Sequence, residues 1–228
     1  MLNWLTRAFI NKCFNKNEHA IVLSSMGRSG STMLFQALGK SAVTLSSNVI
    51  SNPHKKILHR AWQLDQTSLH QGYIYKTHDY PASCLDQSGV KCIYTYSDPL
   101  AVIPSVVKKT EEEGGSWLKA HAEHLRAPHI DSVEELYRRD ALQLEHHFDS
   151  WTRTSHCDVL AIRLDALWKY QETLSDFTGF PIQLPEQHQR SSSLSDLPNH
   201  VQSQIQDTYS SLRKKVQDNE IIHPEKAI

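Results

Sequence analysis

The sequence lacks most of the features that would tie a chain to nucleic acid, a membrane or a repeat architecture. Its 24 Lys and Arg are balanced by 25 Asp and Glu, so no basic excess is present to neutralise a phosphate backbone. We therefore expect no nucleic-acid partner. No apolar run has the length of a transmembrane helix, and no internal repeat or low-complexity block stands out. Any binding site for an anion must be local.

Cysteine is also scarce. The 228 residues contain 4 cysteines, far apart and without a CxxC pair, at Cys13, Cys84, Cys92 and Cys157. This spacing argues against both a zinc site and the disulfide framework of small secreted proteins. We expect reduced, mostly buried thiols and a cytoplasmic location.

The amino-terminal segment MLNWLTRAFINKCFNKNE, residues 1–18, places apolar side chains near one helical face, and we predict an amphipathic helix. The favoured placement is packing on its own domain, and the alternative is a peripheral membrane contact through residues 2–14. Arg7 interrupts the apolar part, which argues against a cleaved signal peptide. The remaining length supports one full-sized core, so residues 19–228 are predicted to form a single domain.

Strand-like and helical patterns alternate along the chain. Runs rich in Val, Ile and Tyr have the composition of strands at residues 20–24, 73–76, 91–96 and 158–163. The clearest helical pattern covers residues 132–153, where apolar side chains recur every three or four positions. This alternation predicts an α/β fold of three layers, with a mostly parallel central sheet flanked by helices. Ligands of such sheets bind at the carboxyl ends of the strands.

The segment GRSGSTMLF follows the first predicted strand and opens a helical pattern. A strand, a tight loop and a helix in this order form a P-loop-like phosphate cradle, because backbone N–H groups converge at the helix N-terminus. Aligned with the pattern GxxxxGK[ST] through Gly30, the chain has Ser31 where an ATP site has its lysine. Arg28 supplies a cation inside the loop instead, and Ser29, Ser31 and Thr32 add hydroxyl donors. A Gly/Ser turn before an unrelated helix is the alternative.

The segment YIYKTHDYP places two ionisable side chains at the end of the second predicted strand. Residues two apart on a strand share a face, so Lys76 and His78 can point to the same site, with Thr77 between them. Histidine suits proton removal from a hydroxyl near neutral pH, and lysine suits a transferring group that carries negative charge. The alternative is an ordinary surface or core histidine.

The segment SDPLAVIPS follows the third predicted strand. Asp98–Pro99 is a strong signal for a turn or a helix start, and Ser105 lies one residue beyond the proline inside the following helical pattern.

In this order and spacing, the three segments resemble the sulfotransferases that use 3′-phosphoadenosine 5′-phosphosulfate (PAPS). GRSGSTMLF resembles the family's 5′-phosphosulfate loop, KTH its catalytic tripeptide and SDPLAVIPS its 3′-phosphate segment. A fourth stretch, VLAIRLDALWKYQETLSDFTGFP, is similar to a strand, turn and helix in the family's carboxy-terminal half. The resemblance spans residues 20–213.

The resemblance implies transfer of a sulfuryl group from PAPS to a hydroxyl (or amine), with 3′,5′-adenosine bisphosphate (PAP) as the product. His78 would be the general base, Lys76 would stabilise the transferring group, and Arg28 would balance charge on the leaving phosphate. The donor-binding residues that the resemblance implies are Arg28, Ser29, Gly30, Ser31, Thr32, Ser97 and Ser105.

One departure from the family lies in the 3′-phosphate segment, which normally begins with an arginine where this chain has Ser97. Losing a charge-assisted contact to phosphate costs about 1.5–3 kcal/mol. Lys108, Lys109 or Arg190 can supply a substitute cation. We favour Arg190, because HQRSSSLSDLPNHV lies where the family has a basic loop over the 3′-phosphate. A solvated loop arginine is the alternative.

The acceptor is predicted only by class, as a small molecule or a glycan, and its pocket is assigned to residues 44–71 and 110–128. The second of these segments is polar and is predicted to form a surface excursion or lid. A P-loop small-molecule kinase is an alternative function, which Ser31 argues against. A non-catalytic binding protein on a sulfotransferase scaffold is another, suggested by Ser97. The oligomeric state is left open.

Histidine pairs occur in HAEH and HH, at His121, His124, His146 and His147. Neither pair has a third ligand at convincing spacing, so we expect no metal and place these side chains on solvated faces.

Overall fold

The computed structural model describes residues 5, 8–10, 12, 14–43 and 52–223. Its centre is a six-stranded sheet in the order β2-β3-β1-β4-β5-β6, in which only the β5–β6 pair is antiparallel. The strands are β1 (Ala20–Ser25), β2 (Leu58–Arg60), β3 (Ile74–Lys76), β4 (Val90–Tyr96), β5 (Asp158–Arg163) and β6 (Ile221–Ile222).

The predicted strands are confirmed as β1, β3, β4 and β5, with shifts of one residue at most. The sequence pattern did not indicate β2 or β6. These strands have three and two residues, too few for an alternating pattern to be visible.

Helices cover both faces of the sheet, which confirms the predicted three-layer α/β fold. The helices are α2 (Ser31–Ala42), α3 (Pro99–Glu113), α4 (Gly115–His124), α5 (Glu134–Arg138), α6 (Leu144–Thr152), α7 (Gln171–Thr178), α8 (Asn199–Thr208) and α9 (Ser210–Gln217). Because side chains alternate along a strand, Ile21 and Leu23 share a buried core with α2 and α7. Val22 belongs to the opposite core, with α3, α4, α6, α8 and α9.

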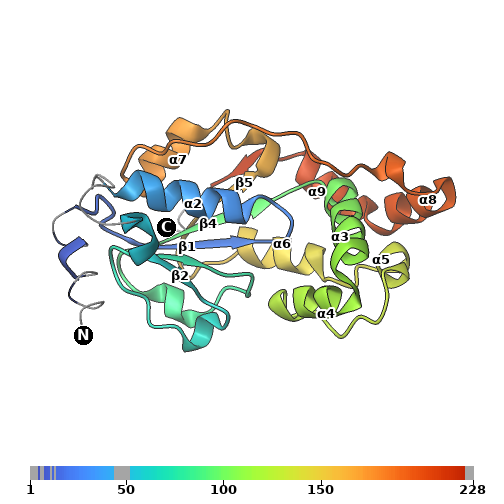
Figure 1. The fold of residues 1–228 in the computed structure, drawn as a ribbon, viewed down its shortest axis with the longest axis horizontal. Coiled ribbons are helices and arrows are strands. Elements are labelled where there is room, and N and C mark those ends of the chain that lie inside the picture. Colours follow the sequence, from blue (N-terminus) through green and yellow to red (C-terminus); the bar gives the residue numbers. More distant parts are fainter. Residues whose placement is uncertain (1–4, 6–7, 11, 13, 44–51, 224–228) are drawn as a thin grey trace.

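The carboxyl ends of the parallel strands face a group of helices. Figure 1 shows α3, α4 and α5 gathered beyond the arrowhead of β1, on the side where α2 begins. Short 3₁₀ turns connect the larger elements at Pro53–Lys56, Leu64–Gln66, Ser83–Asp86, Leu164–Ala166 and Leu194–Asp196. Loops from several strands therefore meet at one edge of the sheet.

The single helix predicted over residues 132–153 is wrong, because the chain forms α5 and α6 with a break between them. Gln143 is in the left-handed region with φ 53°, which ends any continuous helix there. The Asp140 carboxylate accepts hydrogen bonds from the backbone N–H of Leu144 and of Glu145, both at 2.9 Å. Asp140 thus satisfies the free N–H groups of the first turn of α6.

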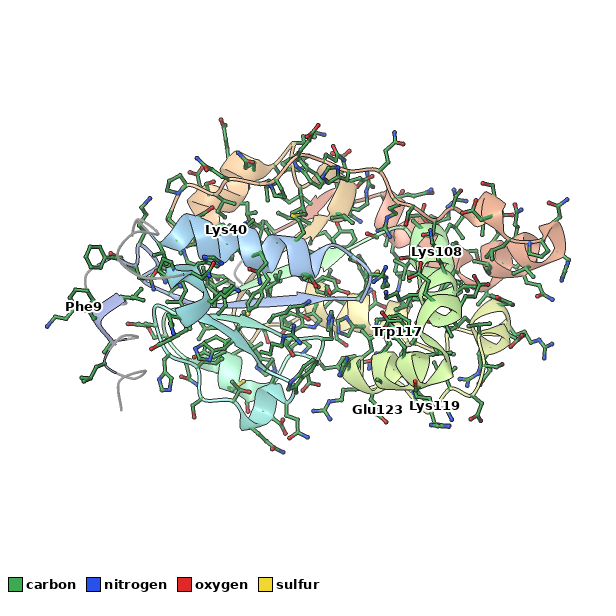
Figure 2. The ribbon with its side chains drawn as sticks, viewed as in Figure 1. Phe9, Lys40, Lys108, Trp117, Lys119 and Glu123 are labelled. Carbon is green, nitrogen blue, oxygen red and sulfur yellow. The ribbon has the colours of Figure 1, made fainter. Side chains whose placement is uncertain are left out.

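The prediction of an amino-terminal amphipathic helix falls largely outside the described residues. Of residues 1–13, those described (5, 8–10 and 12) are helical. Ile10 is buried, whereas Leu5 and Phe9 are exposed, and Phe9 points away from the sheet in Figure 2. In the described part of the chain, no helix combines the length and apolar character needed to cross a bilayer.

Substituting Asp140 with Ala should lower the free energy of unfolding by about 1 kcal/mol, because two N–H groups of α6 lose their acceptor. Urea denaturation measures this change. Asp176→Ala is the matched control, since Asp176 is exposed on α7 and its loss should stay within about 0.5 kcal/mol. Equal effects of the two substitutions would contradict the capping role.

Candidate functional site

The loop between β1 and α2 adopts a backbone that requires glycine at two positions. Gly27 and Gly30 have φ of 80° and 74°, and Arg28 between them is also left-handed at 47°. A Cβ at Gly30 would lie 2.3 Å from Leu164 Cδ1, and one at Gly27 would lie 2.9 Å from His121 Cε1. Left-handed residues within a tight loop let successive backbone N–H groups converge on an anion.

The N-terminus of α2 has no acidic residue in its first turn and no side-chain cap. Its first N–H groups and the positive end of its dipole are therefore available to an anionic group. Ser31 begins the helix, and Thr32 accepts a hydrogen bond from Lys76 Nζ at 2.7 Å. Ser29 is fully buried and donates to the Gly27 carbonyl at 2.8 Å, so its side chain stabilises the loop itself.

His78 lies just beyond β3, where Ser25 ends the neighbouring β1. Its Nδ1 is 3.0 Å from the Ser25 carbonyl oxygen and 3.1 Å from Ser25 Oγ. A carbonyl oxygen only accepts hydrogen bonds, so Nδ1 carries the ring proton and Nε2 carries the lone pair. Nε2 has no hydrogen-bond partner among the described residues. His78 is thereby placed as a proton acceptor.

Burial determines the protonation states of the two side chains from β3. It lowers the pKa of His78 to about 4, although the Ser25 hydrogen bond opposes the shift and the charge of Lys76 adds to it. Burial and the charge of Arg60 lower the pKa of Lys76 to about 8. At neutral pH, His78 is therefore neutral while most Lys76 is protonated. An anion bound beside them would raise both pKa values and strengthen His78 as a base.

Arg190 lies against Ser97. Its Nη2 donates to Ser97 Oγ at 2.8 Å, and its Nη1 donates to the Ala101 carbonyl at 3.3 Å. Lys108 Nζ donates to the carbonyl of Ser191, the residue after Arg190, at 2.8 Å and so stabilises the loop that carries Arg190. Lys109 instead pairs with two glutamates of its own helix, α3. Of the three candidate cations, Arg190 is the one that contacts Ser97.

A second arginine lies close to Arg190. Arg28 Nε donates to Ser105 Oγ of α3 at 3.0 Å. Burial lowers the pKa of Arg190, and the charge of Arg28 lowers it further. Neither arginine forms an ion pair with a described residue. The two guanidinium groups repel each other, and the charges of Asp165 and Asp98 oppose this effect on Arg190 without forming an ion pair with it.

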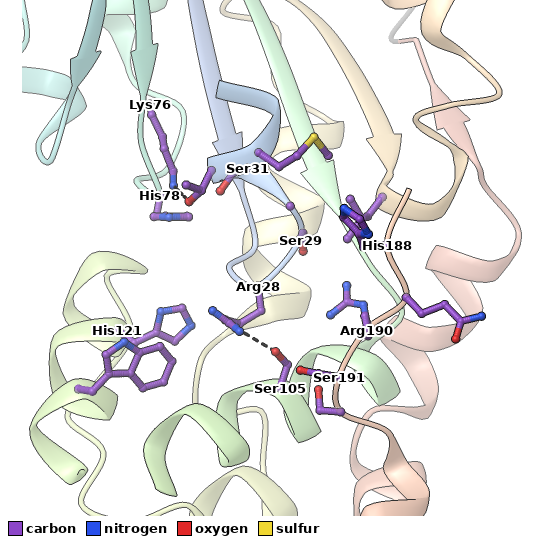
Figure 3. Close-up of a pocket in the computed structure, with 17 residues that line it drawn as sticks. Arg28, Ser29, Ser31, Lys76, His78, Ser105, His121, His188, Arg190 and Ser191 are labelled. Atoms are coloured by element: carbon purple, nitrogen blue, oxygen red, sulfur yellow. Dashed lines mark hydrogen bonds between the residues drawn. The ribbon is translucent and has the colours of Figure 1, made fainter. Parts of the chain in front are cut away.

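The predicted site residues line one cavity of about 490 Å³, with the exception of Ser97. Figure 3 shows Lys76 and His78 on one side, Arg190 on the other and Arg28 between them. The residues predicted from the sequence that line it are Arg28, Ser29, Gly30, Ser31, Thr32, Lys76, His78, Ser105 and Arg190. No Asp or Glu lines this cavity.

Two further cavities adjoin the first. A cavity of about 550 Å³ is lined by Ser97, Trp168 and residues 185–190, and it shares Gly30 and Arg190 with the first. Unlike the first cavity, it has acidic lining residues, Asp98, Asp165 and Glu186. A cavity of about 290 Å³ lies at the other end and shares Thr32, Lys76, His78 and Trp117 with the first. His78 therefore lines both the first and the third cavity.

Helix α4 contributes side chains that sequence reasoning missed. Residues 110–128 were predicted as a surface excursion or lid and as part of an acceptor pocket, with no side chain singled out for that pocket. Most of them are helical, and His121 and Leu118 are buried. Trp117 and His121 line the first cavity with their rings stacked at 4.8 Å. Burial lowers the pKa of His121 to about 3, and its Nε2 has no hydrogen-bond partner among the described residues.

His147 is the second histidine that the sequence analysis placed wrongly on a solvated face. It is fully buried, and its Nε2 lies 3.0 Å from the His78 carbonyl oxygen, to which it donates. Its Nδ1 therefore accepts from the Tyr94 hydroxyl at 3.1 Å. Trp151 donates to the next carbonyl, that of Asp79, at 3.0 Å. The sequence did contain a signal for this burial. His147 lies four residues before Trp151, so both side chains are on the same face of a helix.

The other two histidines of these pairs are exposed, as predicted. His124 stacks on Trp62 and His146 lies beside Tyr80. Within the described part of the chain, no three His, Cys, Asp or Glu side chains come together in a way that could hold a metal ion.

The site is thus a cavity lined by three cationic side chains, Arg28, Lys76 and Arg190, and by no carboxylate. It lies at the carboxyl edge of an α/β sheet, on a P-loop-like strand, loop and helix. No family model matches this chain, and no curated protein sequence matches it. Among solved structures, the mouse sulfotransferase SULT7A1 complexed with PAP is 15% identical over 92% of this chain and 70% of that chain, with a TM-score of 0.43. A likeness this distant carries no argument about the site.

The buried histidines should make the protein sensitive to acid. The pKa values of His78, His121 and His147 lie at about 4, 3 and 3 in the folded state, against an ordinary value of 6.5. Because the unfolded chain binds more protons below pH 6.5, stability present at neutral pH is lost as the pH falls toward 4. Each histidine accounts for about 2 kcal/mol at pH 5.

Urea denaturation at pH 7 and at pH 5 measures this loss, and a His121→Gln variant should lose less between the two. A free energy of unfolding that stays constant over this range would contradict the assignment of three neutral histidines.

Proposed function

We propose that the protein is a PAPS-dependent sulfotransferase, which moves a sulfuryl group to a hydroxyl or amine of a small acceptor. One observation carries this proposal: a neutral histidine with a free Nε2 lies in one cavity with Arg28, Lys76 and Arg190, and no carboxylate lines that cavity. A sulfuryl donor is multiply anionic, and its transfer requires fixed positive charge and a proton acceptor.

The first and second cavities, which share lining residues, match the two ends of the donor. The first, at the loop and the N-terminus of α2, suits the 5′-phosphosulfate. The second is lined by Trp168, Leu164 and Met33 and suits the adenosine. Arg190 lines both cavities and contacts Ser97 of the second, and these two residues would hold the 3′-phosphate. This placement assigns a partner to each of the unpaired arginines.

In the proposed reaction, Nε2 of His78 takes the proton of the acceptor hydroxyl as its oxygen forms a bond to sulfur. The donor supplies the sulfuryl group, and the S–O bond to its 5′-phosphate breaks with the electron pair leaving on the phosphate oxygen. Lys76 would neutralise charge on the transferring group, and Arg28 with the N–H groups of residues 30–32 would stabilise the phosphate. His78 then releases its proton to solvent.

The alternative functions have weaker support. A P-loop kinase would have a lysine where this chain has Ser31, and no Asp or Glu lines the first cavity to help hold Mg²⁺. A non-catalytic binding protein was suggested by Ser97, but Arg190 contacts Ser97 and supplies the cation there.

Binding of PAP is the first test of the proposal. PAP should raise the melting temperature more than AMP or Mg-ATP does, because only PAP carries both the 5′- and the 3′-phosphate. Arg190→Gln should weaken PAP tenfold or more (about 1.5–3 kcal/mol) while changing AMP little. Lys109→Gln is the control, because it removes a positive charge from α3 that pairs with glutamates of the same helix and does not contact Ser97. No preference for PAP in the wild-type protein would overturn the donor assignment.

His78→Ala should lower turnover by about 10²–10⁴-fold, because the proton acceptor is removed, while PAP affinity stays within about twofold. Turnover is followed as PAP release with a phenolic acceptor. His129→Ala is the control, since His129 is exposed and pairs with Asp131. If the His78 variant keeps most of its turnover, the general-base role is wrong.

A further inference from the structure

The third cavity lies beside the reacting groups and away from the donor cavities. It holds about 290 Å³ and shares His78 and Lys76 with the first cavity. Its remaining lining residues include Arg60, Trp62 and His124, none of which lines the other two cavities. If the proposed function is correct, an acceptor placed here would meet Nε2 of His78 opposite the donor.

Two cations lie side by side at this cavity. Arg60 ends the edge strand β2, and its register partner on β3 is Lys76. Register partners on neighbouring strands point to the same face, so the two side chains lie on one side of the sheet. The charge of Arg60 contributes to the lowered pKa of Lys76. Like charges in this arrangement repel each other unless an anion lies between them.

No carboxylate of the described chain compensates Arg60. Arg60 forms no ion pair with a described residue, and the cavity has no acidic lining residue. The nearby Asp79 is fully engaged: it accepts two hydrogen bonds from Arg126, at 3.0 and 3.1 Å, and one from the Leu64 N–H. Burial and the charges of Arg60 and Lys76 lower the pKa of His124, and the charge of Glu123 on the same helix opposes this shift. The cavity is therefore electropositive.

Aromatic side chains form the walls of the cavity. Trp62 is 51% exposed, which is unusual for so large an apolar side chain. It stacks on His124 at 4.3 Å, and the Arg60 guanidinium lies 5.7 Å from its ring centroid. Trp117, labelled in Figure 2, lies at the junction with the first cavity and is fixed by stacking on His121. These rings confine a flat or ring-shaped ligand.

We propose that the acceptor is a small, single-ring hydroxyl compound that carries a carboxylate. The carboxylate binds Arg60, the ring lies between Trp62 and Trp117, and the hydroxyl reaches Nε2 of His78. The hydroxyl oxygen gains the bond to sulfur and loses its proton to His78, and the carboxylate is unchanged in the product. A volume of about 290 Å³ holds about one substituted ring, at the low end of known ligand pockets.

The test compares acceptors that differ only in charge. Dissociation constants are measured calorimetrically on PAP-loaded protein for 4-hydroxyphenylacetate against its neutral amide, and for glucuronate against glucuronamide. We expect the acid of at least one pair to bind tenfold or more tightly than its neutral partner. The pair with the larger difference in affinity tells whether the acceptor is an aromatic acid or a sugar acid. The ratio of kcat/KM with PAPS should follow the same order.

Arg60→Gln should reduce the preference for the acid to about twofold or less and leave PAP affinity unchanged. Arg153→Gln is the matched control, because Arg153 is exposed beyond α6 and pairs with Asp149. Equal binding of acid and neutral compounds by PAP-loaded wild-type protein would overturn the inference while leaving the sulfotransferase assignment intact. A preference retained in Arg60→Gln would overturn it too. Absence of PAP binding would instead refute the proposed function, and the acceptor assignment with it.

Discussion

The hydrogen bond between Nδ1 of His78 and the carbonyl oxygen of Ser25 is the contact on which the site depends. It joins the end of β3 to the end of β1, where the loop of residues 26–30 begins, and it leaves Nε2 as the proton acceptor. His147 and Trp151 of α6 hold the carbonyls of His78 and Asp79 from behind. One layer of helix thus positions the base, while the opposite layer, through α2, presents the helix N-terminus to the same cavity.

A cluster of positive side chains that form no ion pairs is the second constraint. Arg28, Arg190, Lys76 and Arg60 converge along three adjoining cavities, and none forms an ion pair with a described residue. Burial and mutual repulsion lower the pKa values of Lys76 and Arg190. An anionic ligand relieves this repulsion, so the electrostatic cost of assembling the site is recovered on binding. The same argument connects the proposed donor and the proposed acidic acceptor.

Local sequence patterns predicted the parts of the fold whose signals are local. The β-rich runs became β1, β3, β4 and β5, and the glycines around Arg28 predicted the loop, since φ above zero leaves a direct trace in residue choice. The prediction of one helix over residues 132–153 was wrong, because the apolar stripe runs on across a break in the helix. At that break, Asp140 and the left-handed Gln143 start a new helix.

The sequence by itself determined the sheet class, the loop and the chemistry available at its edge, because these depend on residue type and short-range spacing. Only the tertiary structure decided that Arg190 lies against Ser97, from 93 residues away. It also decided that His121 and His147 are buried and that Arg60 lies beside Lys76. These contacts arise from strand order and helix packing, and no local pattern encodes which distant side chains meet.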